Sequence, residues 1–260
     1  MILARITKAL RDQNWLAVAI EFVIVILGVV IGFQISAWND QRQAVARAEV
    51  LTERLIQDMR NEQWRIAAIR AYNAEVSDHA QTVVDALEGR HEIDDEALVI
   101  AAFRATQMIN FTIIRATYDE LVATGGINLI NDRALIDVAV EYYDTTLEQM
   151  TLMAPDRPYR QAFFQLADRP LYDFLANNCA ETPDGLSLGD YASLDNLLDR
   201  PCEIDGHDAA IEAIADHLRN TPSILPLIRH RAIETSVEVR GQTYWRNLLD
   251  SAVPDEGDAP

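Results

Sequence analysis

Basic residues and cysteines are scarce in this sequence. Lysine occurs once, at Lys8, and 22 basic residues stand against 41 acidic ones, a net charge of −19. A field of this sign repels phosphate backbones, so we expect no nucleic-acid partner. Glycine (10 residues) and proline (9 residues) are also few, which excludes collagen-like and low-complexity chains. Apolar residues make up 49% of the chain, enough to bury a core.

Polar residues are nearly missing between Trp15 and Trp38, where the chain reads WLAVAIEFVIVILGVVIGFQISAW. About 24 residues at ~1.5 Å per residue span roughly 36 Å, which covers the hydrocarbon core of a bilayer. A tryptophan at each end matches the aromatic belt of membrane helices. A cleaved signal peptide has a shorter apolar stretch of about 7–15 residues. We therefore expect residues 15–38 to be a retained transmembrane helix, with the lipid bilayer as one partner.

The orientation of this helix depends on the basic residues that flank it. Arg5, Lys8 and Arg11 precede it, and Arg42 and Arg47 follow it. Because basic residues concentrate on the cytoplasmic side of a membrane, the margin of one residue favours a cytoplasmic N-terminus. The rest of the chain is then expected outside the cytoplasm.

Four residues of the apolar segment are not required for membrane anchoring alone. Gly28 and Gly32 form a GxxxG pattern, and Ser36 extends it by one turn. Glu21 lies about two turns before Gly28, on the same helix face. Small residues let a second membrane helix approach closely, and a carboxyl group in a membrane needs a partner. We interpret this face as a helix–helix interface, in a homo-oligomer or against another membrane-protein subunit; the alternative is that Glu21 extends to the headgroups and the glycines have no packing role.

A helical pattern continues after the apolar segment, without proline or glycine from Gln41 to Leu87. Apolar residues recur at a spacing near 3.5, which predicts a long amphipathic helix. Glu62 and Asn73 occupy positions that the pattern assigns to the apolar seam, and Gly89 is the expected stop. Two alternatives stay open: an intermolecular coiled coil, or packing on the chain's own domain.

The remaining sequence predicts an all-α fold, most simply a helical bundle. Pro170 should kink or split one helix, and only Ile127–Ile130 resembles a strand. The expected helices are Asp94 or Asp95 to Gln107, Thr112–Thr124, Asn131 or Asp132 to Pro155, Tyr159–Ala176, Asp205–Asn220 and Ser223–Ala252. The expected domains are a cytoplasmic segment 1–14, a transmembrane helix 15–38, a long amphipathic, coiled-coil-like helix 39–90, a helical domain 91–252 outside the cytoplasm and an acidic flexible tail 253–260.

Cys179 and Cys202 flank a polar loop and are the only cysteines of the chain. Outside the cytoplasm such a pair is usually oxidised. Closing a loop of about 24 residues stabilises a fold by roughly 3 kcal/mol on the chain-entropy account. We therefore predict a disulfide, with two free buried thiols as the alternative. The sequence has no CxxC motif, and two cysteines without paired histidines do not make a zinc site.

The loop between the cysteines contains Gly185-Leu186-Ser187-Leu188-Gly189, a literal G-x-S-x-G. In serine hydrolases this motif needs a strand before it and a helix after it. No strand is predicted before Ser187, so we interpret the match as coincidental.

Two further groups receive structural interpretations. Asp208, Glu212 and Asp216 repeat at helical spacing beside His207 and His217, without a recognised metal-binding spacing, so we expect a solvated helix face. Two adjacent aromatic pairs and one further tyrosine are interpreted as core or interface contacts. They are Tyr118, Tyr142, Tyr143, Tyr244 and Trp245. We expect no catalytic residue, no cofactor and no metal.

Two segments carry a resemblance to a known family. They are NWLAVAIEFVIVILGVVIGFQISAWND at residues 14–40 and TYDELVATGGINLINDRALIDVAVEYY at residues 117–143. Both resemble a family of uncharacterised single-pass inner-membrane proteins of Gram-negative bacteria. The resemblance implies a Gram-negative bacterial source and an inner-membrane location. In such a cell, the orientation expected from the basic residues and the cysteines places the helical domain in the periplasm. It implies no activity and no catalytic residues.

Three classes of function compete on these grounds. We favour a membrane-anchored protein that acts by protein–protein interaction, as an accessory or structural subunit of an inner-membrane assembly. The alternative is a periplasmic ligand-sensing helical bundle that signals through a partner. An enzyme ranks last, because no catalytic group of residues was found.

Overall fold

The computed structural model describes residues 15–109, 112–145, 157–180, 188–194, 197–198 and 201–253. Within these ranges the chain forms helices joined by turns and extended segments, without strands. The predicted all-α fold is therefore confirmed. The expectations for residues 1–14 concern a part of the chain outside these ranges.

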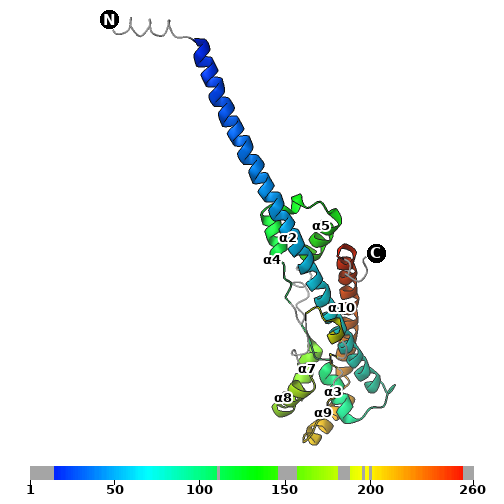
Figure 1. Ribbon diagram of the computed structural model, residues 1–260. Helices are drawn as coiled ribbons and strands as arrows, with labels where there is room; N and C mark the ends of the chain where they lie inside the picture. The colour runs from blue at the N-terminus through cyan, green and yellow to red at the C-terminus, as the bar shows by residue number, and fades with distance from the viewer. Residues whose placement is uncertain are drawn as a thin grey trace.

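α2 (Trp15–Leu87) is one unbroken helix of 73 residues that carries both the apolar and the amphipathic segment. Side chains from Val18 to Arg47 are exposed, and Ala48 is the first buried one. The N-terminal half extends away from the other helices, and the C-terminal half forms part of the packed domain (Figure 1). Within the described residues, α2 is the one helix long and apolar enough to cross a membrane. The predicted continuation of this segment into a long helix is confirmed.

The apolar seam of α2 is buried within the chain from Ala48 onward, and α2 ends at the predicted glycine. Gly89 takes a left-handed backbone with φ +71, which glycine adopts without steric cost. Because the seam packs on the chain's own domain, it does not form an intermolecular coiled coil. The buried seam residues are Ala48, Leu51, Leu55, Met59, Ile66, Val76, Ala80 and Val83.

α10 (Ile224–Ala252) runs back along α2 in the opposite direction. Residues taken in order along α2 contact residues with progressively lower numbers on α10, which shows that the two helices are antiparallel. The contacting pairs are Gln63 with Asp250, Arg70 with Thr243, Ser77 with Ala232 and Glu88 with Arg229. Val253 is buried beyond the end of α10, and its carbonyl accepts a hydrogen bond from Gln63 at 2.7 Å. The predicted flexible tail 253–260 therefore begins too early, because Val253 belongs to the core.

The elements nearest the exposed half of α2 form a proximal group: α4 (Ala116–Ala123), the 3₁₀ turn η1 (Gly126–Leu129), α5 (Arg133–Val140) and the π-helical turn η2 (Glu141–Thr145) (Figure 1). Asp132 caps α5 as predicted, accepting a hydrogen bond from the amide of Leu135. Two predictions were wrong. Residues 127–130 form no strand, because Gly125 reverses the chain into the η1 turn with φ +71. The helix expected from Thr112 begins at Ala116.

The distal group consists of α3 (Asp95–Arg104), α7 (Pro158–Leu166), α8 (Arg169–Asn178) and α9 (Asp208–Asn220). Pro170 separates α7 from α8, as predicted, and Asp168 caps α8 through the amide of Leu171. α9 begins three residues later than expected because Gly206, with φ +76, breaks the chain there.

Each group surrounds its own apolar core, and α2 and α10 contribute to both cores. Between the cores lies a stretch of α2 from Trp64 to Val76, which we call the waist. It carries two small apolar clusters of its own. The fold is thus an antiparallel helix pair with a core at each end and a covered waist between them.

Candidate functional site around Glu62

Glu62 lies in the apolar seam of α2 and is 2% exposed. Its Oε2 accepts a hydrogen bond from the Tyr142 hydroxyl at 2.7 Å. Its Oε1 accepts from Arg65 Nη1 at 2.5 Å and from the backbone N–H of Ile114 at 3.3 Å. A buried carboxylate is tolerated only when it is paired and hydrogen-bonded. The donors come from α2, from the segment before α4 and from η2, so Glu62 ties these three elements together.

Three tyrosines and a tryptophan pack beside Glu62. Tyr118 stacks on Tyr143 with ring centroids 5.0 Å apart. Tyr142 meets Tyr143 edge-on at 5.0 Å and Trp245 at 6.1 Å. These separations are typical of favourable aromatic pairs. The wide turn of η2 allows the consecutive residues Tyr142 and Tyr143 both to be buried, and such π-helical turns often occur at functional sites.

Burial sets the protonation of this cluster. Desolvation, followed by the hydrogen bond with Asp144, raises the pKa of Tyr118 to about 12. Desolvation and the nearby charge of Glu62 also raise the pKa values of Tyr142 and Tyr143. All three hydroxyls therefore stay protonated at neutral pH, and those of Tyr118 and Tyr142 donate hydrogen bonds to carboxylates.

Arg115 lies at the edge of the cluster. Its guanidinium bonds Asp119 at 2.9 Å and the backbone carbonyl of Tyr143 at 3.1 Å, and it lies 5.6 Å from the centre of the Tyr118 ring. The cluster thus combines a carboxylate with three donors, neutral phenols and a paired guanidinium. This arrangement holds the proximal group on α2.

The predicted cysteine pair is brought together. Cys179, at the end of α8, and Cys202 form a disulfide with their Cα atoms 5.2 Å apart. Both ends of the intervening loop are also fixed to α3 by other contacts: Arg104 Nε donates to the carbonyl of Cys179 at 3.2 Å, and Glu96 accepts from the amide of Ile204 at 2.7 Å. The disulfide therefore reinforces a junction that side chains of α3 also hold.

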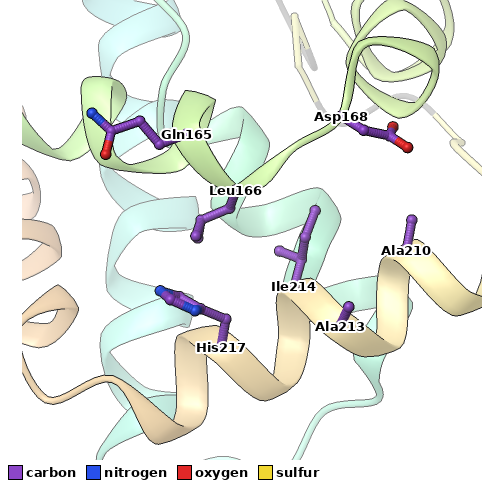
Figure 2. A pocket seen from close by; sticks show the side chains of 7 residues that line it. All are labelled: Gln165, Leu166, Asp168, Ala210, Ala213, Ile214 and His217. Carbon is purple, nitrogen blue, oxygen red and sulfur yellow. The ribbon is translucent and has the colours of Figure 1, made fainter.

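A hollow of about 350 Å³ lies between α7, the start of α8 and α9. Figure 2 shows Gln165 and His217 at one end of it and Asp168 at the other, with Leu166 and Ile214 between them. The α9 side presents alanines, whose small side chains leave the space open. Gln165, Asp168 and His217 are exposed, so a ligand bound here would keep contact with solvent.

The remaining groups singled out in the sequence lie apart from Glu62. Asp208, Glu212 and Asp216 are exposed on α9, and the described part of the chain holds no cluster of three His, Cys, Asp or Glu residues suited to a metal ion. The imidazole of His207 packs against Phe174 with ring centroids 5.4 Å apart. Of the G-x-S-x-G, residues 185–187 lie outside the described ranges, and Gly189 is exposed with φ +85.

The predicted interface residues of the anchor, Glu21, Gly28, Gly32 and Ser36, all lie on the exposed half of α2. A methyl group at Gly28 or Gly32 would meet no atom of the described chain within 4 Å. This face is therefore available for contacts outside the chain, and the interface stays a prediction.

Sequence reasoning placed Glu62 and Asn73 in the seam, and both are buried. It missed three side chains that hold backbone groups of distant segments: Glu75, Glu96 and Arg104. It also missed the buried Arg231, which donates to the carbonyl groups of Ala105 and Gln107 at the end of α3. In the sequence these residues look like ordinary surface charges, and no local pattern distinguishes them.

In comparison with known proteins, the chain matches no family model, no curated protein and no solved structure. Any statement of function must therefore come from the residues themselves and their arrangement.

Proposed function

We propose that this chain is a membrane-anchored helical protein that acts by binding other proteins, as an accessory or structural subunit of a bacterial inner-membrane assembly. The observation that carries the proposal is α2, whose exposed apolar half continues without a break into a half buried in the domain. An unbroken helix couples the position of the domain to that of the anchor. Such coupling suits a subunit that presents a folded domain at a fixed place beside a membrane partner.

The proposed topology has a cytoplasmic N-terminus and a periplasmic helical domain. Two observations support it: the margin of basic residues before the anchor, and the cysteine pair at disulfide distance, which is typical of an oxidising compartment. The resemblance to bacterial single-pass inner-membrane proteins supports the membrane location.

The proposed membrane contact is the face of α2 that carries Glu21, Gly28, Gly32 and Ser36. Small residues at this spacing favour close packing of a second membrane helix, from another copy or from another subunit. The exposure of these residues in the described chain supports a contact of this kind.

A ligand-sensing periplasmic bundle is the second candidate. The hollow in Figure 2 favours it, because its volume is at the lower end of the range for small-molecule sites. In this case α2 would carry the signal to a partner's membrane helix.

Purification of the full chain from membranes in mild detergent, followed by mass spectrometry, distinguishes the candidates. The proposal expects a stoichiometric protein partner, with reduced recovery when Gly28 and Gly32 are both replaced by isoleucine. A retained small molecule without a protein partner would support the sensor instead. Recovery of the chain with neither would contradict both.

A further inference from the structure

A second hollow, of about 560 Å³, lies between the C-terminal end of α2 and the facing part of α10. Its volume falls within the range of small-molecule sites, which are mostly apolar with a few polar groups that orient the ligand. Two buried apolar residues, Val84 and Ala232, line its base. Ser77 and Ser236 line it from the two helices, and their small side chains leave the space open. The hollow is therefore suited in size and in lining to a small amphipathic molecule.

At the end of α2, the charged side chains of the hollow compensate one another. Glu88 forms ion pairs with both Arg90 and Arg229. Arg90 also bonds Asp85, at 2.5 Å. Two guanidinium groups thus face two carboxylates, and this end of the hollow offers no unpaired charge to a ligand.

Asp78 of α2 and Arg240 of α10 line the same hollow, and both side chains are exposed. Among the described residues, neither of them has an ion-pair partner. Arg240 donates a hydrogen bond to the hydroxyl of Ser236 at 3.2 Å. The hollow thus presents an unpaired carboxylate from one helix and an unpaired guanidinium from the other.

The register of the two helices brings these two charges to the same end of the hollow. Ser77, the neighbour of Asp78, contacts the carbonyl of Ala232. Arg240 lies about two turns beyond Ala232 along α10, and its hydrogen bond to Ser236 directs the guanidinium back toward this level. The carboxylate and the guanidinium therefore lie across the hollow from each other, away from the paired charges at the end of α2.

An exposed apolar side chain completes the site. Ile233 lines the hollow beside the buried Ala232 and is 64% exposed. A ligand with an aliphatic side chain would cover it and remove apolar surface from water, which stabilises the complex. The hollow thus joins one negative, one positive and one apolar group.

We propose that this hollow binds a free amino acid with an aliphatic side chain. The guanidinium of Arg240, a planar donor that matches a carboxylate, binds the carboxylate of the ligand, and Asp78 accepts from its ammonium group. The side chain of the ligand covers Ile233. A zwitterion satisfies both unpaired charges, whereas a simple anion would face the carboxylate of Asp78 and the overall charge of −19. This inference goes beyond the proposed function and does not depend on it.

A binding test uses radiolabelled leucine and the full chain in mild detergent. Leucine should bind saturably and raise the midpoint of thermal unfolding, because a ligand that binds only the folded chain stabilises it. Two analogues each lack one charge: 4-methylpentanoate has no ammonium group, and 3-methylbutylamine has no carboxylate. Each should compete with leucine at least about ten-fold more weakly, because one charge-assisted contact is lost.

Substitutions in the hollow test the assigned contacts. Asp78→Asn and Arg240→Gln should each weaken leucine binding at least about ten-fold. Ile233→Ser should weaken the binding of leucine and leave that of glycine, which has no side chain to cover it, unchanged. The matched controls are Asp137→Asn and Arg133→Gln, the same changes at exposed residues of α5 outside the hollow. Both controls should bind leucine as the wild type does.

Three results would overturn the proposal. The first is the absence of saturable binding of leucine, isoleucine and valine to the wild type at millimolar concentrations. The second is equal competition by either singly charged analogue, which would show an anion or a cation site. The third is unchanged leucine binding in both Asp78→Asn and Arg240→Gln. None of them affects the co-purification experiment, so the two proposals can fail separately.

Discussion

The hydroxyl of Tyr142 lies 2.7 Å from Oε2 of Glu62, a residue 80 positions earlier in the chain. Both side chains are buried, so water does not compete for this hydrogen bond. It joins η2 to α2 at the base of the proximal group, where the segment before α4 also meets Glu62. Glu62 thus adds a buried polar junction to the apolar core through which the proximal group also packs on α2.

Replacing Tyr142 by phenylalanine should lower the free energy of unfolding by about 1.5–3 kcal/mol, the usual contribution of a hydrogen bond to a charged group. The control is Tyr244→Phe. Tyr244 also donates to a glutamate, Glu141, but is 53% exposed, so its loss should change stability by less than about 0.5 kcal/mol. Urea unfolding in detergent measures both variants. Equal losses would show that the buried contact has no special role.

Two glycines should respond to alanine in opposite directions. Gly125 has φ +71 and no atom within 4 Å of an added methyl group, so Gly125→Ala meets backbone strain alone and should destabilise the chain by about 1–2 kcal/mol. Gly241 lies inside α10 with equally open space. Gly241→Ala should stabilise the chain by about 0.5–1 kcal/mol. The same sign for both in thermal unfolding would contradict the assigned backbone conformations.

In the anchor, Gly28→Ile with Gly32→Ile should reduce cross-linking to a neighbouring helix without preventing membrane insertion. The bulky side chains keep a second helix from approaching closely. Val30→Ile, which changes a different face, is the matched control. Glu21→Leu should also insert, and should weaken association if the carboxylate makes a cross-helix hydrogen bond worth about 1 kcal/mol. Unchanged association in all variants would mean that the helix is only a tether.

Stability should fall at high pH. Because burial raises the pKa of Tyr118 to about 12, the folded chain holds this proton above pH ~10, where an unfolded tyrosine loses it. The contribution of Tyr118 is therefore complete below about pH 10 and is lost as the pH rises toward about 12. Thermal unfolding between pH 8 and 12 should show this decline, and Tyr118→Phe should make it shallower. A midpoint that does not change up to pH 12 would contradict the buried environment.

The purified chain should show no reactive thiol before reduction, because Cys179 and Cys202 are bonded. Replacing both cysteines by serine should lower the free energy of unfolding by roughly 2–5 kcal/mol. Labelling of both cysteines without a reductant would contradict the disulfide.

The proposed topology has its own test. A reporter active only in the periplasm, fused after Pro260, should be active. Activity of a cytoplasmic reporter at this position would contradict the proposed topology.

Local signals predicted the regular elements well. The apolar spacing from Ala48 to Val83 predicted the buried face of α2. Asp94, Asp132 and Gly89 mark helix ends at the positions that capping rules predict. Pro170 divided one expected helix into α7 and α8, since proline is tolerated in the first turn of a helix and not in its interior.

Long-range contacts decided the rest. Thr112, Ile113 and Ile114 were expected in a helix, but β-branched residues disfavour one, and the amide of Ile114 bonds to Glu62 instead of to its own segment. Glu75 and Glu96 accept hydrogen bonds from backbone amides that lie 122 and 108 residues away in the sequence. No sequence pattern indicates a partner at that separation, so these two contacts could not be predicted.

The unbroken course of α2 has a mechanical consequence. From Trp38 to Leu87 the helix extends for ~74 Å at ~1.5 Å per residue. Membrane helices tilt over a range of about 0–40°, and over this length a swing of ~10° displaces the far end by ~13 Å. A small change in the inclination of the anchor, from a thinner bilayer or a neighbouring helix, is thereby amplified into a movement larger than the diameter of a helix at the distal core.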